Sequence, residues 1–307
     1  MPNDRMDNAY RIASQLLRDT LSRKAPELLE DLDRVQQADV IVVRGQYDRI
    51  EDVFERSGTP YTLLNPDDLS RTALRPDQIV FVNCPGVLPT AALRRVTSFV
   101  EAGGFLFTTD WALRHVLEVA FPGYVAYNQR PTRDDVVRVG IVEAQDPFLA
   151  SILGPEDDPQ WWLENSSYPI QVLDPAQVRI LVTSKDIEDR YGEAPVFITF
   201  EYGQGRVYHM ISHFYLQRSE TRTARHAASS DQYLKEKGLP EEQIARYREM
   251  GTGNLDTASL ESAYTSQVFV SRIILEKQRH KTLTSQAETA GEEGGNVEDT
   301  TKPSLRR

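Results

Sequence analysis

The chain has 307 residues, 40% of them hydrophobic, and its formal net charge of −11 at pH 7 argues against a general nucleic-acid binder, which needs a basic face to neutralise phosphates. Its single cysteine excludes an internal disulfide framework and a cysteine-rich zinc site, and fits a reducing compartment. The sequence opens without the apolar core of a signal peptide and has no apolar run of bilayer length, so we expect a cytoplasmic protein without a membrane partner.

Residues 1–36 are predicted to form a helical N-terminal arm. Apolar residues recur at helical spacing on either side of Pro26, from Ile12 to Leu21 and from Leu28 to Val35. Such a stripe needs a surface on which it can be buried. The simpler interpretation is an arm that packs on the core of the chain, and the alternative is a docking arm for a protein partner or a second subunit.

A strand is predicted over 38–43, a helix over 46–57 and a second strand over 61–64. The turn between the first strand and its helix, RGQYD (44–48), matches neither G-x-G-x-x-G nor G-x-x-x-x-G-K-[ST]. We therefore predict no dinucleotide, no nucleoside triphosphate and no other cofactor.

The stretch 78–114 contains the central strands of the predicted fold. An apolar strand over 79–82 stops at NCPG (83–86), a helix with apolar residues at spacings of three and four follows, and a second apolar run over 105–107 ends in TTDW (108–111). Strand, helix and strand in so few residues form a parallel pair with a right-handed crossover. This pattern predicts an α/β fold with a doubly wound, mostly parallel, flavodoxin-like sheet.

Ligands of such sheets bind beyond the carboxyl ends of the strands, which places the loops 83–86 and 108–111 at the expected site. The predicted ligand-binding residues of these loops are Asn83, Gly86, Thr109 and Trp111. Trp161 and Trp162, adjacent in a polar and turn-rich segment, are predicted to cover the ligand or stack on it, although tryptophan on a loop is more often a packing lid than a ligand platform.

A β-hairpin is predicted from strands over 195–202 and 206–212 around the turn Gly203-Gln204-Gly205. Its second strand leads into His209 and His213, whose even spacing places both on one side of a regular strand. We predict no metal site, but these are the two residues that would form one or act as bases. The alternative is that both histidines are structural.

Residues 217–253 are charged and are predicted to form a mostly helical insertion, with one helix over 240–250. The last long helix is predicted over 255–280, and the polar residues 281–307 are predicted to form a disordered tail. Residues 37–280 are thus expected to form a single α/β domain with helices added at both ends.

Three segments together resemble a known family: VNCPG (82–86), FVEAGGFLFTTD (99–110) and GQGRVYHMISH (203–213). They are similar to segments of the class I glutamine amidotransferase-like superfamily and, more narrowly, of its ThuA-like and other non-amidotransferase members. The resemblance covers about residues 38–216 and part of the last helix. It implies an amidotransferase-like fold.

In catalytic members of this superfamily, the turn that corresponds to 108–111 delivers a cysteine nucleophile, and a histidine follows late in the chain. The turn here has no cysteine and no glycine that would permit a strained backbone, and Phe214-Tyr215 replace the Pro-Glu pair that follows the late histidine, which would be His213. Cys84 lies on the loop where the family has its oxyanion-hole segment. The resemblance therefore implies that glutamine hydrolysis by a thiolate is lost.

The favoured function is a non-catalytic, amidotransferase-like binding or regulatory protein that takes a protein partner or a small polar ligand at the carboxyl edge of the sheet. The first alternative is a hydrolase of altered chemistry, in which Asp110, Glu164 and His213 act as acid and base, assisted by Cys84 or a metal ion. Asp110 could instead be the N-cap of a helix that begins at Trp111. The second alternative is a scaffold subunit that uses the charged segment 218–248, and an oligomer could form through the N-terminal helix.

Overall fold

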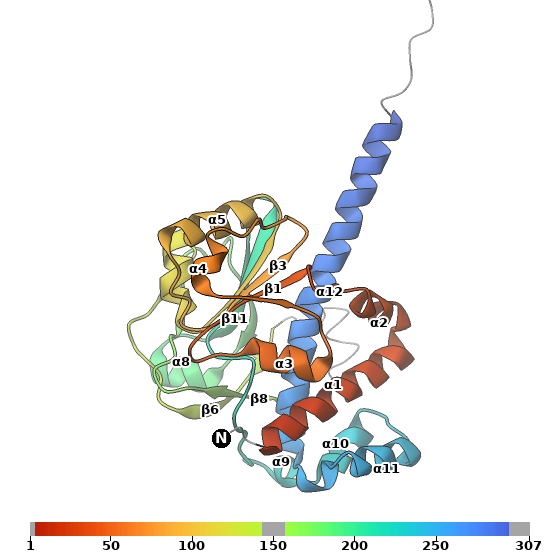
Figure 1. The fold of residues 1–307 in the computed structure, drawn as a ribbon. Helices are drawn as coiled ribbons and strands as arrows, with labels where there is room; N and C mark the ends of the chain where they lie inside the picture. The colour runs from red at the N-terminus through yellow and green to blue at the C-terminus, as the bar shows by residue number, and fades with distance from the viewer. Residues whose placement is uncertain (1–3, 143–156, 295–307) are drawn as a thin grey trace, which may run out of the picture.

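The computed structural model describes residues 4–142 and 157–294 (Figure 1). Its main sheet has eight strands in the order β2-β1-β3-β4-β12-β11-β10-β7. Their bounds are β1 (Val40–Val43), β2 (Thr62–Leu64), β3 (Ile79–Val82), β4 (Phe105–Thr109), β7 (Gly140–Ile141), β10 (Arg179–Thr183), β11 (Pro195–Tyr202) and β12 (Gly205–Met210). The strands from β2 to β12 in this order are parallel, and β11, β10 and β7 each pair antiparallel with their neighbour.

The predicted α/β class and mostly parallel sheet are confirmed by this topology. Every residue of β1, β3 and β4 is buried, as expected for parallel strands that are covered on both faces. The chain moves outward from β1 to β2 and then returns to the other side through β3 and β4, so the strand order reverses beside β1. The predicted hairpin is also present, because β11 pairs with β12 from Tyr202 opposite Gly205 to Phe197 opposite Met210.

Helices flank the main sheet, and two small sheets lie outside it. The helices are α1 (Asp4–Lys24), α2 (Pro26–Asp33), α3 (Ile50–Ser57), α4 (Pro66–Leu69), α5 (Thr90–Glu101), the π-helix η1 (Leu113–Leu117), α6 (Glu118–Ala120), α8 (Lys185–Tyr191), α9 (Ala224–Ala227), α10 (Ser230–Glu236), α11 (Glu241–Glu249), the 3-10 helix η2 (Thr252–Asn254) and α12 (Thr257–Gly294). The small sheets pair β5 (Val125–Tyr127) with β9 (Ile170–Val172), and β6 (Asp135–Arg138) with β8 (Gln160–Leu163).

The N-terminal helix α1 lies across α12 and also contacts α3 (Figure 1). Its apolar stripe, from Ala9 through Leu16 to Leu21, is buried within the chain. The stripe that would have docked a partner or a second subunit is therefore already covered, and the interpretation as an arm that packs on the core is the one that the structure supports.

The last helix differs from its predicted extent. It continues to Gly294, so the prediction of a disordered tail is wrong for residues 281–294, while residues 295–307 lie outside the described part of the chain. The C-terminal part of α12 extends away from the sheet (Figure 1). Within the two described ranges, none of the helices combines the length and the apolar character needed to cross a bilayer.

The charged segment 218–248 contains α9 and α10, which contact α12, and most of α11, which contacts α10. Several of its arginines pair within the chain: Arg225 binds Glu236 and Glu261, and Arg248 binds Asp231. The Arg225–Glu261 pair joins the segment to α12, and the other two pairs lie within the segment. These charges thus have a use other than the scaffold surface that the sequence left open.

Candidate functional site

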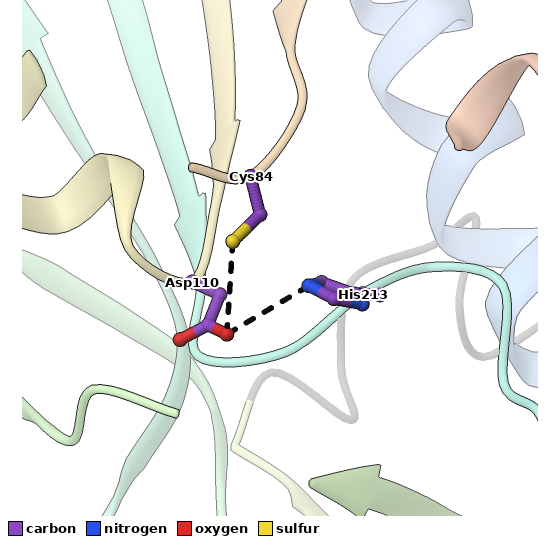
Figure 2. A group of neighbouring side chains, drawn as sticks. All are labelled: Cys84, Asp110 and His213. Carbon is purple, nitrogen blue, oxygen red and sulfur yellow. Dashed lines mark hydrogen bonds and ion pairs between the residues drawn. The ribbon is translucent and has the colours of Figure 1, made fainter. Parts of the chain in front are cut away.

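Three polar side chains meet at the carboxyl edge of the sheet, each from a different loop (Figure 2). Cys84 follows β3, Asp110 follows β4 and His213 follows β12, and these three strands are parallel neighbours in the sheet. Sγ of Cys84 lies 3.9 Å from Oδ2 of Asp110, and Nε2 of His213 lies 3.7 Å from the same oxygen. The structure thus brings together three of the four residues predicted for acid, base or nucleophile chemistry.

The fourth residue, Glu164, joins the cluster from the end of β8. Its Oε2 lies 3.2 Å from Nδ1 of His213, so the imidazole lies between two carboxylates. The two carboxylates that flank the imidazole differ in exposure. The side chain of Glu164 is 36% exposed, whereas those of Asp110 and His213 are 3% exposed. An imidazole oriented by one carboxylate and facing another polar group is the arrangement that acid–base catalysis requires.

The loop that carries Cys84 is fixed by backbone contacts. Its amide donates to Oγ1 of Thr109, which in turn donates to Oδ2 of Asp48 at 2.7 Å. The carbonyl of Cys84 accepts hydrogen bonds from the amides of Gln46 and Tyr47, and a Cβ on Gly45 would lie 2.3 Å from that carbonyl oxygen. Only glycine at position 45 allows the two loops to approach so closely.

Asp110 occupies a strained backbone turn. Its φ is +46°, in the left-handed region that aspartate enters more readily than most residues, so the expectation that this turn lacks strain because it lacks glycine is wrong. The N-cap interpretation is also wrong. The following helix begins at Leu113, and the carboxylate instead accepts hydrogen bonds from the amide of Tyr168 at 2.9 Å and from Oγ of Ser167 at 3.3 Å.

The loop that carries His213 is held by helices from both ends of the chain. The hydroxyl of Tyr10 on α1 donates to the carbonyl of Phe214 and accepts from the amide of Leu216. Oγ of Ser266 on α12 donates to the same Phe214 carbonyl at 2.7 Å. The added terminal helices therefore position the histidine of the site.

Burial sets the protonation of these groups. Removal from water raises the pKa of Asp110 to about 7, an effect that the nearby His213 opposes, and burial also raises the pKa of Glu164. Burial and the charge of Asp110 raise the pKa of the Cys84 thiol far above its usual range. Because a thiol attacks as its thiolate, Cys84 is poorly suited to the role of displaced nucleophile.

The predicted pairing of His209 with His213 on one strand face is wrong, because β12 ends at Met210 and His213 lies in the loop beyond it. His209 is fully buried, and its Nδ1 lies 2.8 Å from Oγ1 of Thr108. Burial lowers the pKa of His209 to about 3. Its role is structural, and it lies outside the Cys84–Asp110–His213 cluster.

This buried histidine has a consequence for acid stability. The pKa of His209 in the folded chain lies below the value of an unfolded chain, so its contribution is present above about pH 6.5 and is lost as the pH falls toward 3. Between pH 6.5 and pH 5 the loss amounts to about 2 kcal/mol of unfolding free energy. We expect urea titrations of His209→Gln to show a shallower decline over this interval than the wild type, and parallel curves would contradict the assignment.

The predicted ligand-binding residues divide into two groups. Trp162 lines the pocket beside His213, and its Nε1 donates a hydrogen bond to Asp134. Trp161, in β8, is buried against Phe269 of α12 and is a core residue. The other four predicted residues make contacts within the fold. The side chain of Asn83 accepts a hydrogen bond from the first amide of α3, and Gly86 packs against Ala112. The hydroxyl of Thr109 bridges Asp48 and the Cys84 amide, and Trp111 stacks on Tyr168 and donates a hydrogen bond to the carbonyl of Ser166.

A polar pocket of about 830 Å³ opens beside His213. Its walls contain carboxylates, guanidinium groups and aromatic rings, and its lining is Asp7, Tyr47, Asp48, Arg49, Asp52, Arg56, Asp134, Trp162, His213, Tyr215, Gln217 and Arg218. Two functional contacts were missed from the sequence. Asp48 lies in the turn between β1 and α3, so it could have been found from the sequence as an acid at the carboxyl edge. Ser167 has no local sequence signal of this kind.

No family profile and no curated protein matches this chain. Among solved structures, a putative ThuA-like protein from Bacteroides uniformis aligns with a TM-score of 0.41 and 11% identity, covering 58% of this chain and 83% of that one. A glutamine amidotransferase from Thermotoga maritima aligns with a TM-score of 0.41 and 12% identity, covering 76% and 98%. A β-galactosidase from Bacillus circulans aligns with a TM-score of 0.40 and 13% identity, covering 61% and 31%. This chain spans between 28% and 36% of the length of the glycosidases it matches first.

Proposed function

We propose that this chain is a hydrolase in which a water molecule is activated where Asp110 and His213 meet, next to the polar pocket. The observation that carries the proposal is the imidazole of His213, which lies between the carboxylates of Asp110 and Glu164 and lines that pocket. Glu164 beside Nδ1 orients the ring so that Nε2 is directed at Asp110. In this orientation Nε2 is the nitrogen that accepts a proton from the attacking group.

The nucleophile in this scheme is water. Its oxygen adds to the electrophilic carbon or phosphorus of the substrate, its proton passes to Nε2 of His213, and the imidazole then gives a proton to the leaving group. The pocket walls, with Arg49, Arg56 and Arg218 set among carboxylates, favour a small polar substrate. We also infer that the chain is a degenerate member of the class I glutamine amidotransferase-like superfamily, in which Asp110 occupies the strained turn where the family has its cysteine.

Glu164→Gln tests the proposal. The change keeps the size of the side chain but weakens its hold on Nδ1 of His213, so we expect kcat/KM to fall by roughly 10- to 100-fold for any substrate that the wild type hydrolyses. The assay is a panel of nitrophenyl esters, phosphate esters, anilides and glycosides. Glu188→Gln, on the exposed surface of α8, is the matched control and is expected to retain full activity.

Equal rates for wild type and Glu164→Gln on every hydrolysed substrate would contradict the proposed role of His213. A second candidate function, binding of a small polar or sugar-like ligand without turnover, is favoured by the near-complete burial of Asp110 and Cys84 beside a pocket that is itself rich in aromatic and charged groups. It predicts thermal stabilisation by such ligands with no turnover in the panel.

A further inference from the structure

We infer that Cys84, Asp110 and His213 form a binding site for a divalent transition metal, with Zn²⁺ as its fitting occupant. One ligand atom from each residue lies within 4.8 Å of the other two, and the three side chains belong to three adjacent loops at the carboxyl edge (Figure 2). The inference rests on the proposed function only for the use of the ion, and it changes the role of Nε2 of His213. In the metal-bound form this nitrogen would be a ligand rather than the proton acceptor, and the ion would activate the water in its place. The existence of the site is argued from geometry and burial alone.

The separations fit a small ion after a slight contraction. Tetrahedral Zn²⁺, with bonds of about 2.3 Å to sulfur and about 2.0–2.2 Å to nitrogen and oxygen, holds its ligand atoms roughly 3.4–3.6 Å apart. Sγ of Cys84 and Oδ2 of Asp110 are 3.9 Å apart, and Oδ2 and Nε2 of His213 are 3.7 Å apart. Both distances are a few tenths of an ångström longer than the coordinated values, and both are too long for strong direct hydrogen bonds.

The buried Nε2 of His213, which lies within the same cluster, has no hydrogen-bond partner in the described part of the chain. The side chain of His213 is 3% exposed. Buried polar atoms of this kind are rare and call for a specific explanation. A cation bound by Nε2, the Asp110 carboxylate and the Cys84 sulfur satisfies all three groups at once and offsets the burial of a carboxylate.

The surroundings of the cluster match those of known metal sites. A histidine that binds a metal through one ring nitrogen generally donates its other N–H to a carboxylate, and Glu164 lies 3.2 Å from Nδ1 of His213. Asp110 is itself oriented by hydrogen bonds from Ser167 and from the amide of Tyr168. Nδ1 of His213 and Oδ1 of Asp110 are the atoms that coordination leaves over, and they are held by Glu164 and by the Tyr168 amide. Oγ of Ser167 donates to Oδ2 of Asp110, the oxygen that would bind the ion.

The donor set selects the class of ion. Sulfur and imidazole nitrogen suit Zn²⁺ and related transition metals, whereas Mg²⁺ and Ca²⁺ take oxygen ligands. Binding releases the proton of the Cys84 thiol to solvent, because the metal ligand is the thiolate. Three protein ligands leave a fourth position for water, which is how catalytic zinc sites differ from structural ones, and bound Zn²⁺ lowers the pKa of that water.

Cobalt substitution tests the site without any substrate. The full-length protein is stripped with a chelator, titrated with CoCl₂ and then with ZnCl₂ as competitor, and its absorption is recorded. Since Cys84 is the only cysteine of the chain, a thiolate-to-cobalt charge-transfer band can arise only from this residue. We expect about one Co²⁺ per chain, a band that Zn²⁺ removes and excess Mg²⁺ does not, and an affinity roughly 10- to 100-fold weaker in Glu164→Gln.

Variants complete the test. Cys84→Ser and His213→Gln are expected to abolish the charge-transfer band and tight binding, while His280→Gln, away from the cluster on α12, is expected to retain both. Absence of the band in the folded wild-type protein, or equal binding by wild type and Cys84→Ser, overturns the inference. Hydrolysis by the chelated protein, together with no charge-transfer band on cobalt addition, would overturn the metal site and support the proposed hydrolase. A charge-transfer band without hydrolysis of any substrate would support the metal site and contradict the proposed hydrolase.

Discussion

Replacing His213 with Gln is expected to lower kcat/KM by roughly 10²–10⁴-fold for the substrates that the wild type hydrolyses. The amide of glutamine retains hydrogen-bonding atoms but cannot take up and return a proton. The imidazole is the group that lies between Asp110 and Glu164 and lines the pocket, so the proposed mechanism loses its proton carrier. Steady-state kinetics on the same substrate panel provide the measurement.

The matched control for this variant is His280→Gln. His280 lies on α12 against the ring of Phe105 and takes no part in the site, so its replacement is expected to leave kcat/KM unchanged. A loss of less than about threefold in His213→Gln, with an intact fold by near-ultraviolet circular dichroism, would show that His213 has no catalytic role.

Phe107→Ala is expected to lower the free energy of unfolding by about 3–5 kcal/mol. Phe107 lies in β4, three residues before Asp110, and is 1% exposed. Its ring centroid lies 4.6 Å from that of Phe214, which follows His213, and 5.5 Å from that of Phe81 in β3. Truncation leaves a cavity between the strands and the loop of His213, and the surrounding rings can fill it only in part.

The free energies of unfolding of Phe107→Ala and of the control variant Val87→Ala are measured by urea titration and compared with that of the wild type. Val87 is 61% exposed, so its truncation is expected to change the unfolding free energy by less than about 0.5 kcal/mol. Because Phe214 loses its partner, we also expect the activity of Phe107→Ala to decline at temperatures where the variant is still folded. A cost of less than about 1 kcal/mol would mean that the packing beneath the site is not tight.

The sheet could be predicted from the sequence because its strands are short apolar runs between clear turn formers. The strand Ile79–Val82 has the predicted bounds, and β4 begins at Phe105 as expected. The strand β8 was missed because Gln160 to Leu163 lies among polar and turn-forming residues, and its pairing with β6 is a long-range contact. Local patterns carry no information on such contacts.

The candidate site was predictable in part for the same reason. The loops of Cys84 and Asp110 follow neighbouring parallel strands, so their meeting at one edge follows from the topology. Glu164 and Ser167 reach the cluster from a segment outside the main sheet, whose path the sequence pattern does not determine. The strain at Asp110 does not follow from the sequence, because a turn without glycine is not expected to be left-handed, although aspartate tolerates this conformation.

The measurement that tests the central claim most directly is a crystal structure at neutral pH that shows the space between Nε2 of His213 and the carboxylate of Asp110. The account predicts that these atoms face each other as they do here, 3.7 Å apart, with Glu164 on Nδ1 and with density for a water molecule or a metal ion beside them. An imidazole turned away from Asp110, or an Asp110 carboxylate bound to the amides of the helix that follows it, would contradict the proposed site.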